Sequence, residues 1–162
     1  MKSKKLKSGF TLIELTIIIV VLAVIAFVVA AIITQAADAW LFVKARETAL
    51  SQGRMAVERM VRELRAINRP VNIITATTTE CEFINTASAT VKFNQSGANL
   101  MRNNDILVSG VVSPEGLQFS YYDANLNTTS TKQNMRYITV RLQLIRGDQD
   151  ITLEDSARIR NL

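Results

Sequence analysis

The side chain with the clearest chemical consequence is Glu14, an acidic residue at the start of a long apolar segment. Residues 15–33 contain one polar side chain, that of Thr16, and no charge, glycine or proline. A carboxylate beside such a segment is tolerated if it reaches lipid headgroups at the end of a helix, or if it pairs with a cation. The role of Glu14 therefore depends on the positive group that it meets.

The other reactive residue types form no catalytic pattern. The chain has no histidine, which excludes Ser-His-Asp and Cys-His catalysis and imidazole metal ligands. It also has no glycine-rich phosphate loop and no pair of carboxylates at a recognisable spacing. We therefore expect a protein that is not an enzyme and has no cofactor. A buried carboxylate pair with strongly shifted pKa values in a cleft would reverse this expectation.

The single cysteine, Cys81, lies between Glu80 and Glu82. An internal disulfide is impossible, and two adjacent carboxylates would raise the pKa of the thiol and suppress its reactive thiolate form. We favour a small structural residue in a strand over a reactive or intermolecular thiol.

A second acidic group lies near the C-terminus, at Asp148, Asp150, Glu154 and Asp155. Calcium takes several oxygen ligands, so these side chains could bind it. A solvated acidic turn is the simpler interpretation, and we predict no metal site.

The apolar segment predicts a membrane-spanning helix, because 19 residues without a charge are about the length needed to cross a bilayer core. Residues 1–9 carry four lysines, which favours a cytoplasmic N-terminal tip and a chain that projects outward. Without this tip the chain has 15 basic and 14 acidic side chains. The net charge of +5 is therefore mostly a property of the tip and gives no reason to expect DNA as a partner.

The helix should continue well past the membrane, from residue 10 to about residue 68, because residues 34–67 contain no proline and a single glycine, Gly53. Residue 69 precedes Pro70 and should end the helix, since a residue before proline avoids the α region. The later half is amphipathic, with Glu58 expected to pair with Arg62. Its predicted apolar face consists of Leu50, Gly53, Val57, Met60, Val61, Leu64 and Ile67.

Residues 70–162 change to strand periodicity. In residues 137–144 apolar and polar side chains alternate strictly, which predicts a strand with one buried face. We expect one antiparallel sheet packed on the apolar face of the helix, and thus an α+β fold with a small β head. The other predicted features are a hairpin at residues 95–98, a strand at 117–121, a loop at 123–133, a turn at Gly147-Asp148 and last strands at 151–153 and 157–161.

Three interpretations of the N-terminus compete. A secretory signal peptide would be cut near Ala37-Asp38-Ala39, but its apolar region is normally shorter, about 7–15 residues. A plain membrane anchor explains the length and the lysines and leaves Glu14 as an unexplained cost.

The third interpretation is a resemblance to a known family. The basic leader followed by Gly9-Phe10-Thr11-Leu12-Ile13-Glu14 resembles the signature of type IV prepilins and of the pseudopilins of type II secretion. The resemblance implies that a prepilin peptidase removes residues 1–9 by cutting between Gly9 and Phe10 and methylates the new amine of Phe10. It also implies a role in filament assembly for Glu14.

That amine would lie four residues from Glu14, so the two charges could pair within one helix or between neighbouring subunits. In an apolar bundle an unpaired carboxylate is costly, so pairing between subunits would favour one axial register.

A second resemblance to the same family involves the head and the helix half that precedes it. Segments of both resemble the J-type minor pseudopilins and related minor pilins, which cap or initiate filaments. The segments are Arg54-Met55, Glu58-Arg59-Met60, Arg62-Glu63-Leu64-Arg65, residues 117–123 and residues 157–162.

The predicted organisation is a leader at residues 1–9, a helix at 10–68 and a β head at 70–162. Residues 10–33 would form the membrane span and filament core, and residues 34–68 the amphipathic half. The predicted function is that of a structural, minor filament subunit held in the bacterial inner membrane, with the head outside the cytoplasm. Its partners would be other pilin or pseudopilin subunits, the prepilin peptidase and the assembly platform. The alternative is a membrane-anchored binding protein whose β head recognises a ligand, a surface polymer or DNA.

Overall fold

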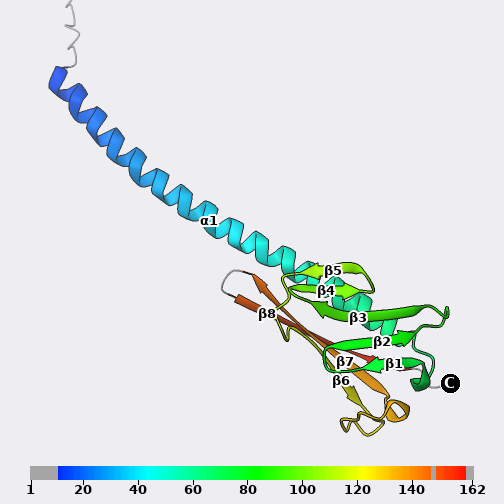
Figure 1. The fold of residues 1–162 in the computed structure, drawn as a ribbon. Coiled ribbons are helices and arrows are strands. Elements are labelled where there is room, and N and C mark those ends of the chain that lie inside the picture. Colours follow the sequence, from blue (N-terminus) through cyan, green and yellow to red (C-terminus); the bar gives the residue numbers. More distant parts are fainter. Residues whose placement is uncertain (1–10, 147–148, 160–162) are drawn as a thin grey trace, which may run out of the picture. The chain divides into compact units, whose positions relative to one another are not determined.

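The computed structural model describes residues 11–146 and 149–159. One long helix is followed by eight strands in two antiparallel sheets (Figure 1), which confirms the predicted α+β class with a β head. The elements are α1 (Leu12–Arg65), η1 (Pro70–Asn72), β1 (Ile73–Ala76), β2 (Glu80–Ile84), β3 (Thr90–Ser96), β4 (Asn99–Arg102), β5 (Asp105–Ser109), β6 (Leu117–Tyr122), η2 (Lys132–Asn134), β7 (Tyr137–Arg146) and β8 (Gln149–Arg158).

The chain divides into two compact units, Met1–Val43 and Lys44–Leu162. The described part of the first unit, residues 11–43, holds the apolar stretch of α1, residues 15–33. The second unit holds the rest of α1 and both sheets. The predicted turn at Gly147-Asp148 and the end of the predicted last strand, residues 160–161, lie outside the described residues.

Helix α1 ends three residues before the predicted position. Its last turn tightens, because the amides of Ala66 and Ile67 donate to the carbonyls of Glu63 and Leu64, three residues back, at 3.1 Å each. Arg69 is already extended, as expected of a residue before proline (φ −140°, ψ 147°). Ile67 is fully buried, so the chain turns toward the core before Pro70 is reached.

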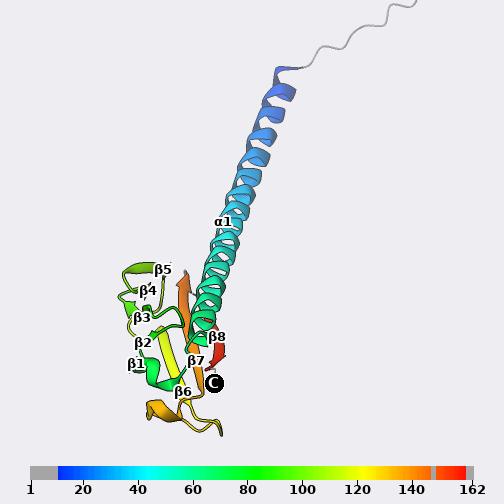
Figure 2. The same cartoon turned by 90° about the vertical axis from the view of Figure 1, so that its right-hand side faces the viewer.

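The apolar face of α1 was predicted correctly in the second unit. Six of the seven predicted residues are buried, and Leu50 packs against the core while partly exposed. Gly53 allows the closest approach, since a Cβ there would lie 2.6 Å from Leu144 Cδ1 and 2.7 Å from Leu153 Cδ1. The helix therefore packs directly on β7 and β8, which lie beside it in Figure 2.

The strands form two sheets where the sequence predicted one. Sheet one has the order β1-β2-β3-β4-β5 and sheet two the order β6-β7-β8. The chain leaves β5 at Gly110, whose φ is +85°, and β6 then pairs with β7 over six residues instead of extending the first sheet. The two sheets meet where the Phe119 amide donates to the Thr78 carbonyl at 2.7 Å.

Strand β7 shows the predicted alternation. Ile138, Val140, Leu142 and Leu144 are buried, and the residues between them face outward. Its partner β8 is one continuous strand paired with all ten residues of β7, so the prediction of two separate last strands was wrong. The middle of β8 is polar, and its side chains form pairs with those of β7 on the exposed face. In one such pair, Thr139 Oγ1 lies 2.9 Å from Ser156 Oγ.

The predicted hairpin at residues 95–98 is confirmed. Strands β3 and β4 pair through Ser96 and Asn99, and Gly97 occupies the turn with a φ of +58°. A positive φ at the first of two turn residues is the reason that glycine stands there.

Candidate functional site

Glu14 lies in the first turn of α1 and is exposed. The preceding Thr11 caps the helix: its Oγ1 accepts a hydrogen bond from the Glu14 amide at 3.3 Å, and its carbonyl accepts one from the Leu15 amide at 3.2 Å. A carboxylate in the first turn is also favoured by the positive end of the helix dipole. Local structure therefore holds Glu14 at the helix start, where no described side chain pairs with its carboxylate.

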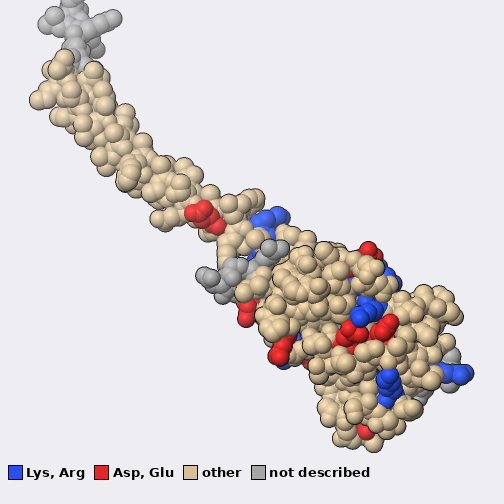
Figure 3. Space-filling view, viewed as in Figure 1, with Lys and Arg blue, Asp and Glu red and all other residues tan. Residues whose placement is uncertain are grey.

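The apolar stretch of α1 presents large hydrophobic side chains on all sides. Leu12 is 83% exposed and Phe27 is 77% exposed, and every residue from Thr11 to Thr48 is exposed. Monomeric soluble proteins rarely expose so large an apolar surface. Helix α1 is long and apolar enough to span a membrane, and the face drawn in Figure 3 shows no charged side chain along the first half of the helix.

The length of the apolar stretch fits a helix that spans a membrane. Glu14 and Asp38 are the charged residues that bound the stretch, 24 positions apart, which is about 36 Å at about 1.5 Å per residue. A bilayer core is about 30 Å thick, or about 40–45 Å with its interfaces. Both carboxylates would therefore lie near an interface when the stretch crosses a membrane.

The remaining predicted site residues, Gly9 and Phe10, lie outside the described residues. Cleavage after Gly9, methylation of Phe10 and its pairing with Glu14 therefore stay predictions.

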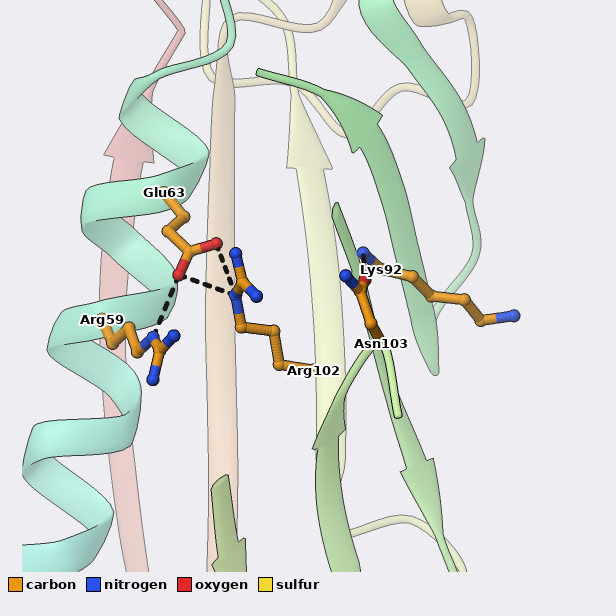
Figure 4. Close-up of polar contacts among 5 residues, drawn as sticks. All are labelled: Arg59, Glu63, Lys92, Arg102 and Asn103. Carbon is orange, nitrogen blue, oxygen red and sulfur yellow. Dashed lines mark hydrogen bonds and ion pairs between the residues drawn. The ribbon is translucent and has the colours of Figure 1, made fainter. Parts of the chain in front are cut away.

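A polar cluster on the head joins α1 to β4 (Figure 4). Arg102 Nε donates to both oxygens of Glu63, at 2.9 Å and 2.8 Å, and Arg59 Nε donates to Glu63 Oε1 at 3.0 Å. The expected pair of Glu58 with Arg62 does not form among the described residues. Glu63 is the member that the sequence could not assign, because its partner Arg102 lies 39 residues away.

The same corner of the first sheet is closed by Asn103, which has a positive φ of +53° after β4. Its amide donates to the Lys92 carbonyl and its side-chain oxygen accepts the Lys92 amide, both at 2.8 Å. Asn103 thus continues the β3–β4 ladder by one residue and holds β4 in the position from which Arg102 reaches Glu63.

Cys81 is a buried residue of β2, as predicted. Burial raises the pKa of its thiol to about 12, with a smaller contribution from the charge of Glu80, while a hydrogen bond with Tyr121 opposes the rise. Burial also raises the pKa of Tyr121, whose hydroxyl donates to the Thr77 and Glu80 carbonyls at 3.0 Å and 3.3 Å. A protonated thiol with no exposed surface is a core residue, not a nucleophile.

The sequence analysis considered the acidic residues near the C-terminus as possible calcium ligands and favoured a solvated turn. Asp148 lies outside the described residues, and Glu154 pairs with Arg141 across β7 and β8, with 3.6 Å between Oε2 and Nε. Within the described ranges, no three acidic, cysteine or histidine side chains gather as metal ligands.

Comparison of the chain with protein-family models, with curated proteins and with solved structures found no match. Function must therefore be argued from the described residues and from the N-terminal sequence.

Proposed function

We propose that this chain is a structural subunit of a type IV pilus-like or type II secretion filament, held in the inner membrane before assembly. The observation that carries the proposal is Glu14, an exposed carboxylate with no described ion-pair partner at the start of the apolar stretch of α1. The resemblance of residues 1–33 to prepilins and of the head segments to J-type minor pseudopilins supports a minor, capping or initiating position.

The physical argument concerns the environment of Glu14 inside a bundle of such helices. A charged side chain at the centre of a membrane helix costs about 2.5–3.5 kcal/mol on insertion scales, and less near the helix end. Removing residues 1–9 would create a positive amine on Phe10, four residues from Glu14 in the sequence. When the amine of one subunit meets Glu14 of its neighbour, both charges are compensated, and helices in another register lose this pairing.

The proposal also states on which side of the inner membrane each end of the chain lies. The lysine-rich residues 1–9 stay in the cytoplasm, where the prepilin peptidase removes them, and the head faces the periplasm. The assembly platform then transfers the mature subunit from the membrane to the filament, where neighbouring helices replace lipid around the apolar stretch.

The first test replaces Glu14 by glutamine, which keeps size and helix propensity and removes the charge. We expect Glu14→Gln to insert in the membrane and lose its leader as before, and to enter sheared filaments at least about tenfold less, since one uncompensated amine remains in each interface. The matched control is Glu47→Gln, the same change at another exposed position of α1.

Unchanged incorporation of Glu14→Gln would refute the assembly role and favour the membrane-anchored binding protein. Mass spectrometry of the native N-terminus gives a separate check. The proposal requires a chain that begins at N-methylated Phe10. A chain that begins at Met1, or at Trp40 after a signal-peptide cut, would contradict it.

A further inference from the structure

An open cavity of about 930 Å³ lies at the end of the head where α1 finishes. The last turn of α1, the start of β7 and the end of β8 form its walls, together with loops from both sheets. Four of its lining side chains are arginines: Arg62, Arg65, Arg136 and Arg158.

Secondary structure brings these arginines together. Arg62 and Arg65 are three residues apart in the last turn of α1, so they share a face. Tyr137 at the start of β7 pairs in register with Arg158 at the end of β8, and Arg136 directly precedes β7. Residues more than 70 positions apart in the sequence thus converge on one cavity.

The cavity carries excess positive charge. In the described part of the chain, no carboxylate pairs with Arg62, Arg65 or Arg158, whereas Arg59, Arg102 and Arg141 each have a carboxylate partner. Two acidic residues, Glu63 and Asp123, adjoin the lining in sequence. Glu63 is paired with Arg59 and Arg102, and Asp123 is satisfied within its own loop. Its Oδ1 accepts the amides of Asn125 and Asn127 at 2.8 Å and 2.9 Å, and these hydrogen bonds lower its pKa.

Three of the arginines have contacts with neutral groups of the head. Arg65 Nη2 donates to the Ser156 carbonyl at 3.4 Å, and Arg136 Nη1 donates to the Gln133 and Met135 carbonyls at 2.8 Å and 2.9 Å. The Arg158 guanidinium lies 5.9 Å from the centre of the Tyr137 ring. These contacts orient Arg65 and Arg158 without neutralising them.

We propose that this cavity binds an acidic peptide segment of a partner protein through its side-chain carboxylates. Planar guanidinium groups match carboxylates in paired hydrogen bonds. The volume is at the upper end of the range for ligand pockets, about 300–1,000 Å³, and larger than a single small anion needs. Exposed Asn68 and Thr86 at the wall can bond the peptide backbone.

The geometry favours a peptide over nucleic acid. Single strands bind where bases stack on open aromatic rings along a basic groove. Among the described lining residues the one aromatic side chain, that of Tyr137, is covered by Arg158, and the arginines surround a compact hollow.

The test uses the full chain in detergent and a fluorescent octapeptide of glutamate, with binding followed by anisotropy. We expect Arg62→Gln and Arg158→Gln each to weaken binding about tenfold, the usual effect of losing a charge-assisted hydrogen bond. The matched control, Arg54→Gln, removes the same charge from an exposed position of α1 outside the cavity and should change binding less than twofold. All three sites are exposed, so the variants should fold, which circular dichroism verifies.

Three outcomes would overturn the proposal. Equal loss in Arg54→Gln would show general electrostatic attraction, and equal binding of an octapeptide of glutamine would show that carboxylates are not recognised. Tighter binding of a single-stranded oligonucleotide of equal charge would assign the cavity to nucleic acid. Because the assay uses dispersed chains, its result is independent of Glu14 and of filament assembly.

Discussion

Cys81 in the first sheet and Tyr121 in the second are hydrogen-bonded neighbours in the core, where burial keeps both in their protonated forms. Their ionisation is therefore linked to unfolding. In the unfolded chain the thiol loses its proton near its ordinary pKa of 9.0, and in the folded chain only near 12. Between these values the unfolded state binds fewer protons than the folded state, so stability falls as the pH rises.

We predict that the free energy of unfolding decreases above pH 9 by up to about 1.4 kcal/mol per pH unit from this one group. Tyr121 acts in the same direction from about pH 10, its ordinary value. Urea unfolding of the full chain in detergent between pH 7 and pH 11 measures the slope. In Cys81→Ala the free energy of unfolding should begin to decrease about one pH unit higher, because only Tyr121 remains. An identical slope in that variant would exclude the thiol as its source.

The sequence identified the type of chemistry at single residues better than it identified their partners. The suppressed thiolate at Cys81 was predicted correctly, but its main cause is burial, and of the two flanking carboxylates only Glu80 raises the pKa of the thiol. Glu63 lies outside the predicted apolar face of the helix, and no local pattern singles it out. Its contact with Arg102 depends on strand order and on the turn at Asn103, which no local pattern reveals.

Among the elements, α1 is fixed to the head by one apolar face and by the Glu63 cluster. Glu63 and Arg102 are each about one-fifth exposed, whereas the Arg59 side chain is 50% exposed. Solvent screens the more exposed pair, so the two arginines should contribute unequally.

We predict that Arg102→Met lowers the free energy of unfolding by roughly 1 kcal/mol, while Arg59→Met changes it by about 0.3–0.5 kcal/mol, the range for exposed helix pairs. A double-mutant cycle with Glu63→Gln should give the larger coupling for Arg102. If the coupling of Glu63 with Arg102 equals its coupling with Arg59, the contact between α1 and β4 stabilises the head no more than the ion pair within the helix does.

The helix and strand patterns were predictable because each element repeats a simple period. The apolar face of α1 follows helical spacing and the buried face of β7 follows strict alternation, and both were read correctly. Element ends were not, since the tightened last turn of α1 serves the burial of Ile67 by residues far away in the sequence. Strand β8 was split in the prediction because its polar residues 154–156 are satisfied only once β7 lies beside them.

At the scale of the whole molecule, the fold class followed from the sequence and the division into two sheets did not. The division depends on the crossing between β5 and β6, which is held by the side chain of Gln95. Its Nε2 donates to the Val112 carbonyl at 2.8 Å, and its Oε1 accepts the Leu117 amide at 3.0 Å. The arginine cavity was equally hidden, because it forms only when the end of α1, the start of β7 and the end of β8 meet at one place.

We predict that Gln95→Met destabilises the head by about 1–3 kcal/mol, because a partly buried carbonyl and amide lose their partners. The matched control is Gln143→Met, the same change on β7 at a side chain with no described hydrogen bond, which should cost less than about 0.5 kcal/mol. Chemical unfolding of both variants tests this. Equal effects would show that the crossing is held by packing alone.

The order of strands in both sheets has a consequence for how the chain acquires its structure. Every described strand pair joins neighbours in the sequence, so each hairpin closes a short loop and loses little chain entropy. Docking of α1 is different, since Arg65 and Ser156 meet across 91 residues. A contact so distant along the chain is slow to form. The ladders can therefore assemble in the order in which the chain emerges, and the second half of the helix waits for β7 and β8 before its apolar face is covered.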